Sequence, residues 1–338
     1  MNDSLPGSPV DWASRRVLVT GAGGFIGSHL TEALVRLGAQ VRVFVRYTSR
    51  AEQGLLTDLP PEARERLEVV SGDLRDQDAV RQACAGITHI FHLGALIAIP
   101  YSYLHPAEVV ETNVLGTLNV LLAARDCGVE QLIHTSSSEV YGTAQTETIG
   151  EEHRLLGQSP YSASKIGADK LVESFHYSFD LPVVIVRPFN TYGPRQSARA
   201  VIPTIISQAL TRDQVRLGSL TPCRDFTYVQ DTVDGLLRAA GNGQAIGETI
   251  NLGANHEVSV GELAHKIIAL IGRPVEIVAD DERLRPPRSE VMRLRSDNRK
   301  AQKLLGWQPR VPLDAGLHQT IDWISAHPER YTAGQYQI

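Results

Sequence analysis

The sequence predicts an α/β protein with a doubly wound parallel sheet and a smaller, discontinuous second domain. Short β-branched runs alternate with amphipathic stretches, several of these runs are apolar on both faces, and a glycine-rich loop follows the first run. Runs that are apolar on both faces are typical of parallel strands covered by helices on either side, joined by right-handed crossovers. The predicted strands are 16–20, 41–45, 67–71, 89–93, 131–135, 182–187 and 248–252.

Helical patterns lie between these strands, and a change of pattern after about residue 190 indicates the second domain. Loops lengthen there, and Arg and Pro gather in 193–199 and 283–288. The strand pattern at 248–252 suggests that the chain returns to the sheet, so the second domain is discontinuous. The predicted helices include 27–37, 113–127, 202–210 and 259–271. We expect a sheet domain over 14–189 and 226–257, a smaller domain over 190–225 and 258–325, and a flexible tail at 1–13.

The composition is that of an ordinary globular protein. The 338 residues are 42% hydrophobic and 21% charged, and a net charge of -5 without a basic stripe argues against nucleic-acid or membrane-surface partners. The N-terminus lacks a signal-peptide pattern and no apolar run approaches the roughly 20 residues of a membrane span, which favours the cytoplasm. Cys84, Cys127 and Cys223 lie far apart, so we expect a reducing compartment, no disulfide framework and no metal site.

The glycines Gly21, Gly24 and Gly27 follow the first strand and open the first helix. Glycine permits a tight turn and lets a pyrophosphate approach the free N–H groups of a helix N-terminus. The three-residue spacing differs from the commoner G-x-G-x-x-G fingerprint, and a purely structural turn is the alternative. Because a strand precedes the loop and a helix follows it, we predict a Rossmann-like NAD(P)-binding domain. The residues assigned to cofactor binding are Gly21, Gly24, Phe25, Ile26, Gly27, Arg46, Asp73, Leu74, Leu93, Ala95, Asn113, Tyr161 and Lys165.

The end of the second strand bears on the choice between NAD and NADP. A carboxylate there would hold the ribose hydroxyls, whereas arginine accommodates a 2′-phosphate. The chain has Arg46 and Arg50 at this place and no acid, which favours NADP; two solvated loop arginines are the alternative. Asp73 ends the third strand and can accept a hydrogen bond from the adenine amino group, although a plain turn aspartate fits the pattern too.

Tyr161 and Lys165 form a Tyr-x-x-x-Lys pair at the start of a predicted helix. Ser159 followed by Pro160 is typical of a helix N-cap and first position, which places the pair one turn apart on one face. Such a lysine is expected to lower the pKa of the tyrosine and to hold the nicotinamide ribose, so that Tyr161 can act as a base near neutral pH. Surface helices often contain this spacing, so the prediction depends on the neighbouring motifs.

Ser137, Ser138 and Glu139 directly follow the strand at 131–135. They should lie at the carboxyl edge of the sheet, where doubly wound folds bind their ligands. Ser137 is placed to hydrogen-bond a substrate hydroxyl that becomes a carbonyl, and Glu139 to take a proton from the adjacent carbon. A solvated loop carboxylate is the alternative for Glu139.

The chain resembles the extended short-chain dehydrogenase/reductases of the nucleotide-sugar epimerase/dehydratase family. Its Ser137-Ser138-Glu139 is similar to the Ser-Glu version found in GDP-mannose 4,6-dehydratases, whereas simple 4-epimerases usually lack the glutamate. Within the family, the segments 95–103, 194–203 and 285–291 most resemble the NDP-N-acetylglucosamine 4,6-dehydratase of legionaminic acid biosynthesis. The motifs that carry the family resemblance are 92–95, 113–117, 139–142, 187–195, 224–231 and 306–309.

This resemblance implies a lyase that converts an NDP-hexose, GDP- or UDP-N-acetylglucosamine, to its 4-keto-6-deoxy form with a tightly bound, recycled NAD(P). Tyr161 and Ser137 would assist oxidation at C4, Glu139 would remove the C5 proton, and Glu139 or Ser138 would protonate the departing C6 hydroxyl. An NDP-sugar 4-epimerase, which would leave Glu139 idle, and an NDP-uronic acid decarboxylase are the enzymatic alternatives. A non-catalytic dinucleotide-binding sensor is the alternative from another class.

The resemblance also implies a set of side chains that hold the substrate diphosphate. Arginine suits this role because its guanidinium binds phosphate in a bidentate way, although each candidate taken singly can be a solvated surface arginine. Family members commonly form homodimers, and the helices near 108–125 and 161–178 would be the dimer helices. The candidates for substrate binding are Asn190, Arg195, Arg199, Arg224, Arg285 and Arg288.

Overall fold

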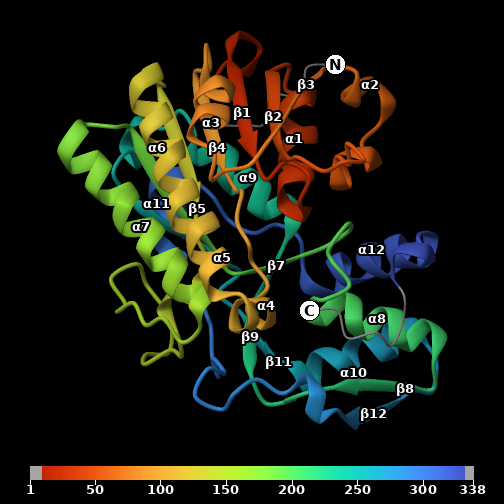
Figure 1. Cartoon of the computed structure of the whole chain (residues 1–338). Coiled ribbons are helices and arrows are strands. Elements are labelled where there is room, and N and C mark those ends of the chain that lie inside the picture. The colour runs from red at the N-terminus through yellow and green to blue at the C-terminus, as the bar shows by residue number, and fades with distance from the viewer. Residues whose placement is uncertain (1–9, 332–338) are drawn as a thin grey trace.

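A seven-stranded parallel sheet forms the larger lobe of the computed structural model, which describes residues 10–331 (Figure 1). The strand order is β10-β6-β5-β4-β1-β2-β3, so the order reverses between β1 and β4. In doubly wound folds, ligands bind beside the carboxyl ends of the strands at such a reversal. Each strand predicted from the sequence is confirmed: β1 (Arg16–Thr20), β2 (Gln40–Arg46), β3 (Leu67–Gly72), β4 (His89–His92), β5 (Gln131–Thr135), β6 (Val183–Pro188) and β10 (Thr249–Leu252).

Helices cover both faces of this sheet, which is why its strands are apolar on both sides. One buried cluster joins the sheet to residues of α1, α9 and α11, and a second cluster joins the opposite face to α3, α6 and α7. The predicted doubly wound architecture is therefore confirmed. The bounds of these helices are α1 (Phe25–Arg36), α3 (Gln77–Cys84), α6 (Gly116–Cys127), α7 (Pro160–Phe179), α9 (Val229–Ala239) and α11 (Arg299–Leu305).

A smaller lobe lies at the carboxyl edge of the sheet (Figure 1). It holds a three-stranded sheet, β11-β9-β7, and a parallel pair, β12-β8, around its own apolar core. Its strands are β7 (Asn190–Tyr192), β8 (Gln214–Leu217), β9 (Cys223–Tyr228), β11 (Glu257–Ser259) and β12 (Glu276–Ala279), and its helices are α8 (Val201–Thr211), α10 (Val260–Ile271) and α12 (Leu313–Ala326).

The two cores divide the chain somewhat differently from the expected domain boundaries. Residues 226–228 of β9 belong to the small sheet, and Phe226 packs in the smaller core. Conversely, Leu305 and Trp307 pack in the larger core, although the sequence places 258–325 in the smaller domain. The discontinuity of the small lobe itself follows from the return of the chain through α9 and β10 to the larger lobe.

The expected tail at 1–13 is only partly within the described residues, because 1–9 lie outside them, as do 332–338. Trp12, in the short helix η1 (Trp12–Ser14), is 3% exposed. Its ring lies 5.7 Å from His89 and 6.0 Å from Phe91, measured between ring centroids. Trp12 therefore packs into the large lobe, and its assignment to a flexible tail is wrong.

The helical stretch Pro106–Cys127 is long and apolar enough to cross a membrane by length and composition, which the sequence analysis did not anticipate. Half of it is buried within the molecule, as is typical of a core helix. It contains a π-helical turn, η3 (Glu111–Leu115), between α5 (Pro106–Val110) and α6. The remaining short helices are η2 (Gly54–Asp58), α2 (Pro61–Arg64), α4 (Ile99–Leu104), η4 (Ser138–Tyr141), η5 (Gly243–Ala245), η6 (Asp281–Arg283) and η7 (Pro328–Arg330).

Candidate active site

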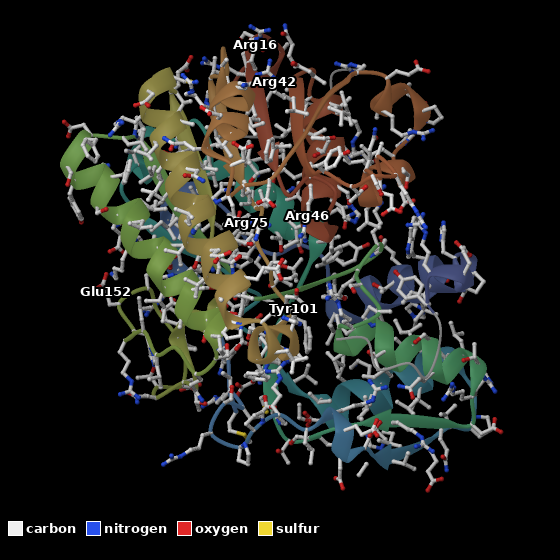
Figure 2. The ribbon with its side chains drawn as sticks, viewed as in Figure 1. Arg16, Arg42, Arg46, Arg75, Tyr101 and Glu152 are labelled. Carbon is white, nitrogen blue, oxygen red and sulfur yellow. The ribbon has the colours of Figure 1, made fainter. Side chains whose placement is uncertain are left out.

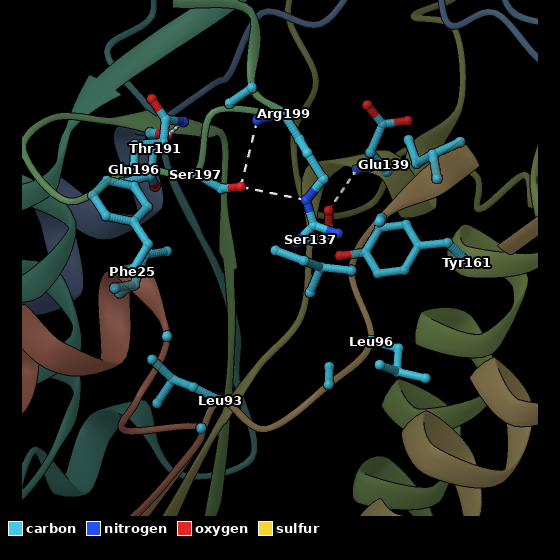
Figure 3. A pocket seen from close by; sticks show the side chains of 18 of the residues that line it. Phe25, Leu93, Leu96, Ser137, Glu139, Tyr161, Thr191, Gln196, Ser197 and Arg199 are labelled. Atoms are coloured by element: carbon cyan, nitrogen blue, oxygen red, sulfur yellow. Dashed lines mark hydrogen bonds between the residues drawn. The ribbon is translucent and has the colours of Figure 1, made fainter. Parts of the chain in front are cut away.

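A cavity of about 920 Å³ lies at the carboxyl edge of the large sheet. Both lobes line it: the glycine loop and the ends of β2 to β6 from the large lobe, and residues of β9, α8 and the loops near 218 and 285 from the small lobe. Figure 3 shows Phe25 and Leu93 on one side of this space and Glu139 and Tyr161 on another. The volume is at the upper end of the range for small-molecule sites.

The glycine loop forms the N-terminal approach to α1. Gly21 has φ of 70°, and a Cβ there would lie 2.7 Å from the backbone nitrogen of Gly94. A Cβ on Gly27 would lie 2.2 Å from the carbonyl oxygen of Gly21. Gly24 caps the helix without any side-chain hydrogen bond, so the first-turn N–H groups remain for an anionic ligand. These positions fit the diphosphate of a dinucleotide.

A loop that the sequence analysis did not single out packs against this cradle. The backbone nitrogen of Leu55 donates to the carbonyl of Gly23 at 2.9 Å, and a Cβ on Gly54 would lie 2.5 Å from that carbonyl oxygen. Asp58 at the end of η2 forms an ion pair with Arg330. The loop residues Glu52, Gln53 and Gly54 line the cavity beside the glycine loop.

The ends of β2 and β3 form the wall expected to face the adenosine. Asp73 accepts hydrogen bonds from the Arg75 guanidinium at 3.0 and 2.7 Å, and these bonds lower the pKa of Asp73. The Asp73 carboxylate is thus already paired with a neighbour that the sequence analysis missed. Arg46 lines the cavity with a 63% exposed side chain, 3.5 Å from Glu108 (Figure 2).

The strand end at 136–139 forms a tight turn that brings its polar side chains into the cavity. Ser137 caps the short helix η4, and its hydroxyl accepts a hydrogen bond from the Glu139 backbone nitrogen at 3.2 Å (Figure 3). Ser137, Ser138 and Glu139 all line the cavity, with Ser138 3% exposed. The predicted position at the carboxyl edge of the sheet is confirmed.

Helix α7 carries Tyr161 and Lys165 to the same wall. Its N-terminus has a reciprocal capping box between Ser159 and Ser162, with Pro160 in the first turn, which confirms the predicted helix start. Tyr161 is 7% exposed and Lys165 is 3% exposed, and both line the cavity.

The electrostatics of this pair differ from the expectation. Burial raises the pKa of Tyr161 to about 12, although its hydrogen bond to Ser137 acts in the opposite direction. Burial also lowers the pKa of Lys165 to about 8, and the Lys165 ammonium donates to the carbonyl of Thr135 at 2.8 Å. The expected lowering of the tyrosine pKa by the lysine is therefore wrong for the chain alone, because burial dominates and the ammonium is directed to a backbone carbonyl.

One residue predicted to contact the cofactor lies behind the cavity wall. Asn113 is 1% exposed and is not among the lining residues. Its side chain accepts from the Leu96 backbone nitrogen at 2.7 Å and donates to the Leu96 carbonyl and to Ser164, each at 2.9 Å. Asn113 therefore fixes a lining loop against α7, and its direct contact with the cofactor stays a prediction. The lining residues that the sequence predicted are Gly21, Gly24, Phe25, Ile26, Gly27, Arg46, Asp73, Leu74, Leu93, Ala95, Tyr161 and Lys165.

The predicted substrate-binding residues divide into two groups. Asn190, Arg199, Arg224 and Arg285 line the cavity, and Figure 3 shows the Arg199 side chain inside it. The structure brings these four residues together on the small-lobe side of the cavity. A further lining residue, which the sequence analysis missed, is the acid Glu290.

Arg195 and Arg288 are not among the residues that line the cavity, so their contact with a ligand stays a prediction. Arg195 has a left-handed backbone conformation, with φ of 68°, and its guanidinium pairs with Glu32 of α1 at 2.7 Å. Its guanidinium also lies 5.9 Å from the Trp323 ring of α12. Arg288 is exposed on the loop that precedes Glu290.

Glu290 joins the two small-lobe arginines of the cavity. One of its carboxylate oxygens lies 3.1 Å from an Arg224 nitrogen and 3.5 Å from an Arg285 nitrogen. Burial lowers the pKa of Arg224, while the charges of Glu139 and Glu290 raise it. A pair of arginines held by one carboxylate is a suitable site for a diphosphate.

The glycine cradle at α1 and the Ser-Tyr-Lys cluster at the sheet edge define a Rossmann-like member of the short-chain dehydrogenase/reductases. Comparison with known families narrows this class, because the family described as GDP-mannose 4,6 dehydratase matches residues 18–320. The chain therefore belongs to this family.

Relatives within reach of sequence comparison have three different activities. The chain is 34% identical to a UDP-glucose 4-epimerase of Mycolicibacterium smegmatis, over 91% of this chain and 98% of the relative. It is 31% identical to UDP-glucuronic acid decarboxylase 1 of Xenopus tropicalis, over 95% of this chain and 75% of the relative. The structure of DesIV, a dTDP-glucose 4,6-dehydratase of Streptomyces venezuelae solved with NAD, matches with a TM-score of 0.82 and 31% identity, over 93% of this chain and 98% of DesIV. Relatives of this chain are therefore dehydratases, epimerases and decarboxylases.

Proposed function

We propose that this protein is an NAD(P)-dependent nucleotide-sugar 4,6-dehydratase acting on GDP- or UDP-N-acetylglucosamine, as in legionaminic acid biosynthesis. One observation carries the proposal: Glu139 lines the same cavity as Ser137, Tyr161 and Lys165, and its backbone nitrogen is hydrogen-bonded to Ser137. A base in this position has a task in the elimination of water but none in simple epimerisation.

The glycine loop and the wall near Arg46 are the proposed site of the cofactor. The cradle at Gly21, Gly24 and Gly27 supports this, as does the NAD bound to DesIV. When bound there, a nicotinamide would supply the acceptor of the C4 hydride and the donor of hydride to C6, and its positive charge would favour the deprotonated form of a nearby phenol. Arg46 and Arg75 on the adenosine wall favour NADP over NAD, because arginine accommodates a 2′-phosphate.

Tyr161 and Ser137 handle the O4 proton in the proposed reaction. The Ser137 hydroxyl holds O4 of the sugar, and Tyr161 takes its proton as C4 becomes a ketone. Lys165 lies one turn further along α7 and is the proposed contact of the nicotinamide ribose, in exchange for its present bond to the Thr135 carbonyl.

Glu139 handles the proton at C5. The ketone at C4 acidifies that proton, Glu139 removes it, and the C6–O bond breaks as the hydroxyl takes a proton from Glu139 or Ser138 and leaves as water. When C6 is reduced, C5 regains a proton from solvent through Glu139, and Tyr161 releases the O4 proton to solvent. The O4 proton and the C6 hydroxide together account for the one water lost, so the product is a 4-keto-6-deoxy sugar nucleotide.

The small-lobe side of the cavity is the proposed site of the substrate diphosphate. Arg224 and Arg285 already converge on one carboxylate oxygen of Glu290, and Asn190 and Arg199 line the same space. Two guanidinium groups at one point complement the charge of a diphosphate.

The test is a mass spectrum of UDP- and GDP-N-acetylglucosamine after incubation with the purified protein and no added reductant. We expect one of the two to lose a single water with no net change in the cofactor, and to carry deuterium at C5 when the reaction runs in D₂O. Glu139→Gln should abolish the loss of water and the incorporation of deuterium. Tyr161 and Ser137 should still support oxidation at C4 in this variant, seen as a rise in the absorbance of reduced nicotinamide. An unchanged mass with a new C4 epimer would instead establish an epimerase.

The 4-epimerase and uronic acid decarboxylase remain the second candidates, because relatives with both activities align along most of the chain. Glu139→Gln distinguishes a 4-epimerase from a dehydratase, since an epimerase should retain turnover in this variant. Release of carbon dioxide from an NDP-uronic acid identifies the second. Absence of turnover on every sugar nucleotide would favour a dinucleotide-binding sensor.

We also propose that the protein acts as a cytoplasmic homodimer through the helical stretch 106–127 and helix α7. Apolar side chains exposed on the helical stretch 106–127 and on α7 support this, and they include Val110, Leu115, Tyr177 and Phe179. Sedimentation velocity of the full chain distinguishes a monomer from a dimer.

A further inference from the structure

We propose that Asp169 is a positioning residue, whose buried carboxylate offsets positive charge beneath Lys165 and joins α7 to the strands that carry the reacting groups. This inference concerns the machinery of the proposed function, but its first test depends on no reaction. Asp169 lies one helical turn beyond Lys165 on α7, is fully buried, and does not line the cavity.

The Asp169 carboxylate links three elements of the large lobe. Its Oδ2 accepts hydrogen bonds from the Ser136 hydroxyl at 2.9 Å and from the Arg187 guanidinium at 3.1 and 2.9 Å. Ser136 directly precedes Ser137 at the end of β5, and Arg187 lies on β6. Such a buried ion pair adds little net stability, because desolvation offsets the attraction, but removing one partner leaves a buried charge that nothing offsets.

The network continues from Arg187 to the turn that carries Glu139. The Arg187 guanidinium donates to the Tyr141 hydroxyl at 2.9 Å, and Tyr141 donates to the Asn251 side chain at 2.8 Å. Tyr141 is fully buried in η4, two residues after Glu139. Asp169 and Arg187 therefore hold the turn through Ser136 and Tyr141, whereas Ser137 caps its short helix η4.

The groups that face Lys165 come from four elements. Asp169 and Tyr161 share its helix, His134 of β5 and His92 of β4 lie near it, and Arg187 of β6 lies beyond Asp169. Burial lowers the pKa of both histidines, to about 4 for His134, so both are neutral at pH 7. With Tyr161 also neutral, Asp169 is the one anion in this set.

The charge balance explains why this carboxylate matters to Lys165. Burial acts to raise the pKa of Asp169, but its contact with His134 and the charges of Arg187 and Lys165 outweigh burial and lower it. For Lys165, burial lowers the pKa to about 8 and Asp169 opposes that effect. Removing the anion would leave the buried ammonium near a second cation, Arg187, in a region of low dielectric.

The first experiment follows the titration of Lys165 by NMR of protein labelled with ¹³C-lysine, as purified. Assignment is tractable because the lysines are Lys165, Lys170, Lys266, Lys300 and Lys303. We expect the Lys165 midpoint near pH 8 in the wild type. In Asp169→Asn it should fall by about one unit or more, since an opposite charge within a few ångströms shifts a pKa by about 1–3 units.

A matched control removes a carboxylate from the same helix. Glu173 lies one turn beyond Asp169 but pairs with Lys170 at the surface, so Glu173→Gln should leave the Lys165 midpoint unchanged. If Asp169→Asn alone does not fold, the double variant Asp169→Asn/Arg187→Met removes both members of the ion pair, so that neither is left as a buried charge without its partner. It should shift the Lys165 midpoint in the same direction. An unshifted midpoint in a folded variant overturns the proposal.

The second experiment is the pH profile of turnover, if turnover is found. Lys165 is needed as an ammonium, so activity falls as pH rises through its pKa. The alkaline limb of kcat for Asp169→Asn should therefore move to lower pH by the same interval as the NMR midpoint, while KM changes less than threefold because Asp169 does not touch the cavity. A change in KM alone would contradict a role in positioning Lys165. Failure of every substrate to turn over would count against the proposed function and leave the NMR result standing.

Discussion

The two walls of the cavity are built in different ways. On the large-lobe wall, Tyr161 and Lys165 are almost fully buried, and behind them lies a buried hydrogen-bond network around Asp169. On the small-lobe wall, Arg285 has a side chain that is 29% exposed, and Arg199 is exposed. The first wall is therefore fixed by the fold, whereas the second is partly solvated.

This difference matches what each wall has to do. Proton transfer requires a fixed geometry, because small displacements of reacting groups are costly in rate. A phosphate clamp needs charge and reach, and guanidinium groups can move to a ligand from a solvated state. Glu290 holds Arg224 and Arg285 together, so even the looser wall keeps its charges at one point.

The largest effect should come from breaking the buried network in the first wall. Arg187→Met leaves the Asp169 carboxylate buried without its main cationic partner, and we expect a loss of about 3–5 kcal/mol in the free energy of unfolding. The pKa of Asp169 should rise, since the Arg187 charge acts to lower it. Thermal and urea unfolding measure the loss.

A control for this prediction lies on the same helix. Lys170 pairs with Glu173 at 2.6 Å, but its side chain is 58% exposed, so Lys170→Met should cost less than about 1 kcal/mol. Equal losses of unfolding free energy in Arg187→Met and Lys170→Met would contradict the distinction between the buried network around Asp169 and the solvated surface pair.

The sequence predicts the first wall well because its signals are local. A strand ending in hydroxyls, an N-cap followed by proline, and a four-residue spacing on a helix each determine positions within a few residues. What the sequence does not reveal is the network behind the wall. Asp169 and Arg187 lie on different elements, and their contact depends on how α7 packs over β6. The pKa of Tyr161 was mispredicted for the same reason, since burial is a tertiary property.

The second wall is predicted less well because its residues lie on long loops. An arginine in a loop can point to either side of the backbone, and one left-handed residue changes the direction of the chain. Arg195 is such a residue and turns toward Glu32, away from the cavity. Glu290 was missed because an acid among arginines gives no diphosphate signal in the sequence, although it joins Arg224 to Arg285.

A smaller but specific effect is expected from Arg224. Arg224→Gln removes a charged donor from the proposed clamp, and a hydrogen bond to a charged group contributes about 1.5–3 kcal/mol, which is about a 10- to 150-fold rise in Kd. Calorimetry with GDP and UDP measures it. Arg224→Lys should give an intermediate Kd, because the charge remains but the bidentate fork is lost. An unchanged Kd in Arg224→Gln would place the diphosphate elsewhere.

The smallest effects on ligand binding should come from Arg195 and Arg288, which do not line the cavity. Variants of these two arginines test how far the small-lobe wall of the cavity extends. Arg195→Met breaks a largely buried pair with Glu32, so the free energy of unfolding should fall by about 1–3 kcal/mol while the Kd for GDP or UDP stays within about twofold. Arg288→Ala should change stability by less than about 0.5 kcal/mol and leave the Kd within the same limits, because its side chain is exposed. The contrast is informative because Arg195 is followed by the lining residue Gln196, and Arg288 lies between the lining residues Arg285 and Glu290. If Arg288→Ala raised the Kd tenfold, the loop at 285–291 would have to close over the ligand, and the small-lobe wall would be larger than the unliganded cavity shows.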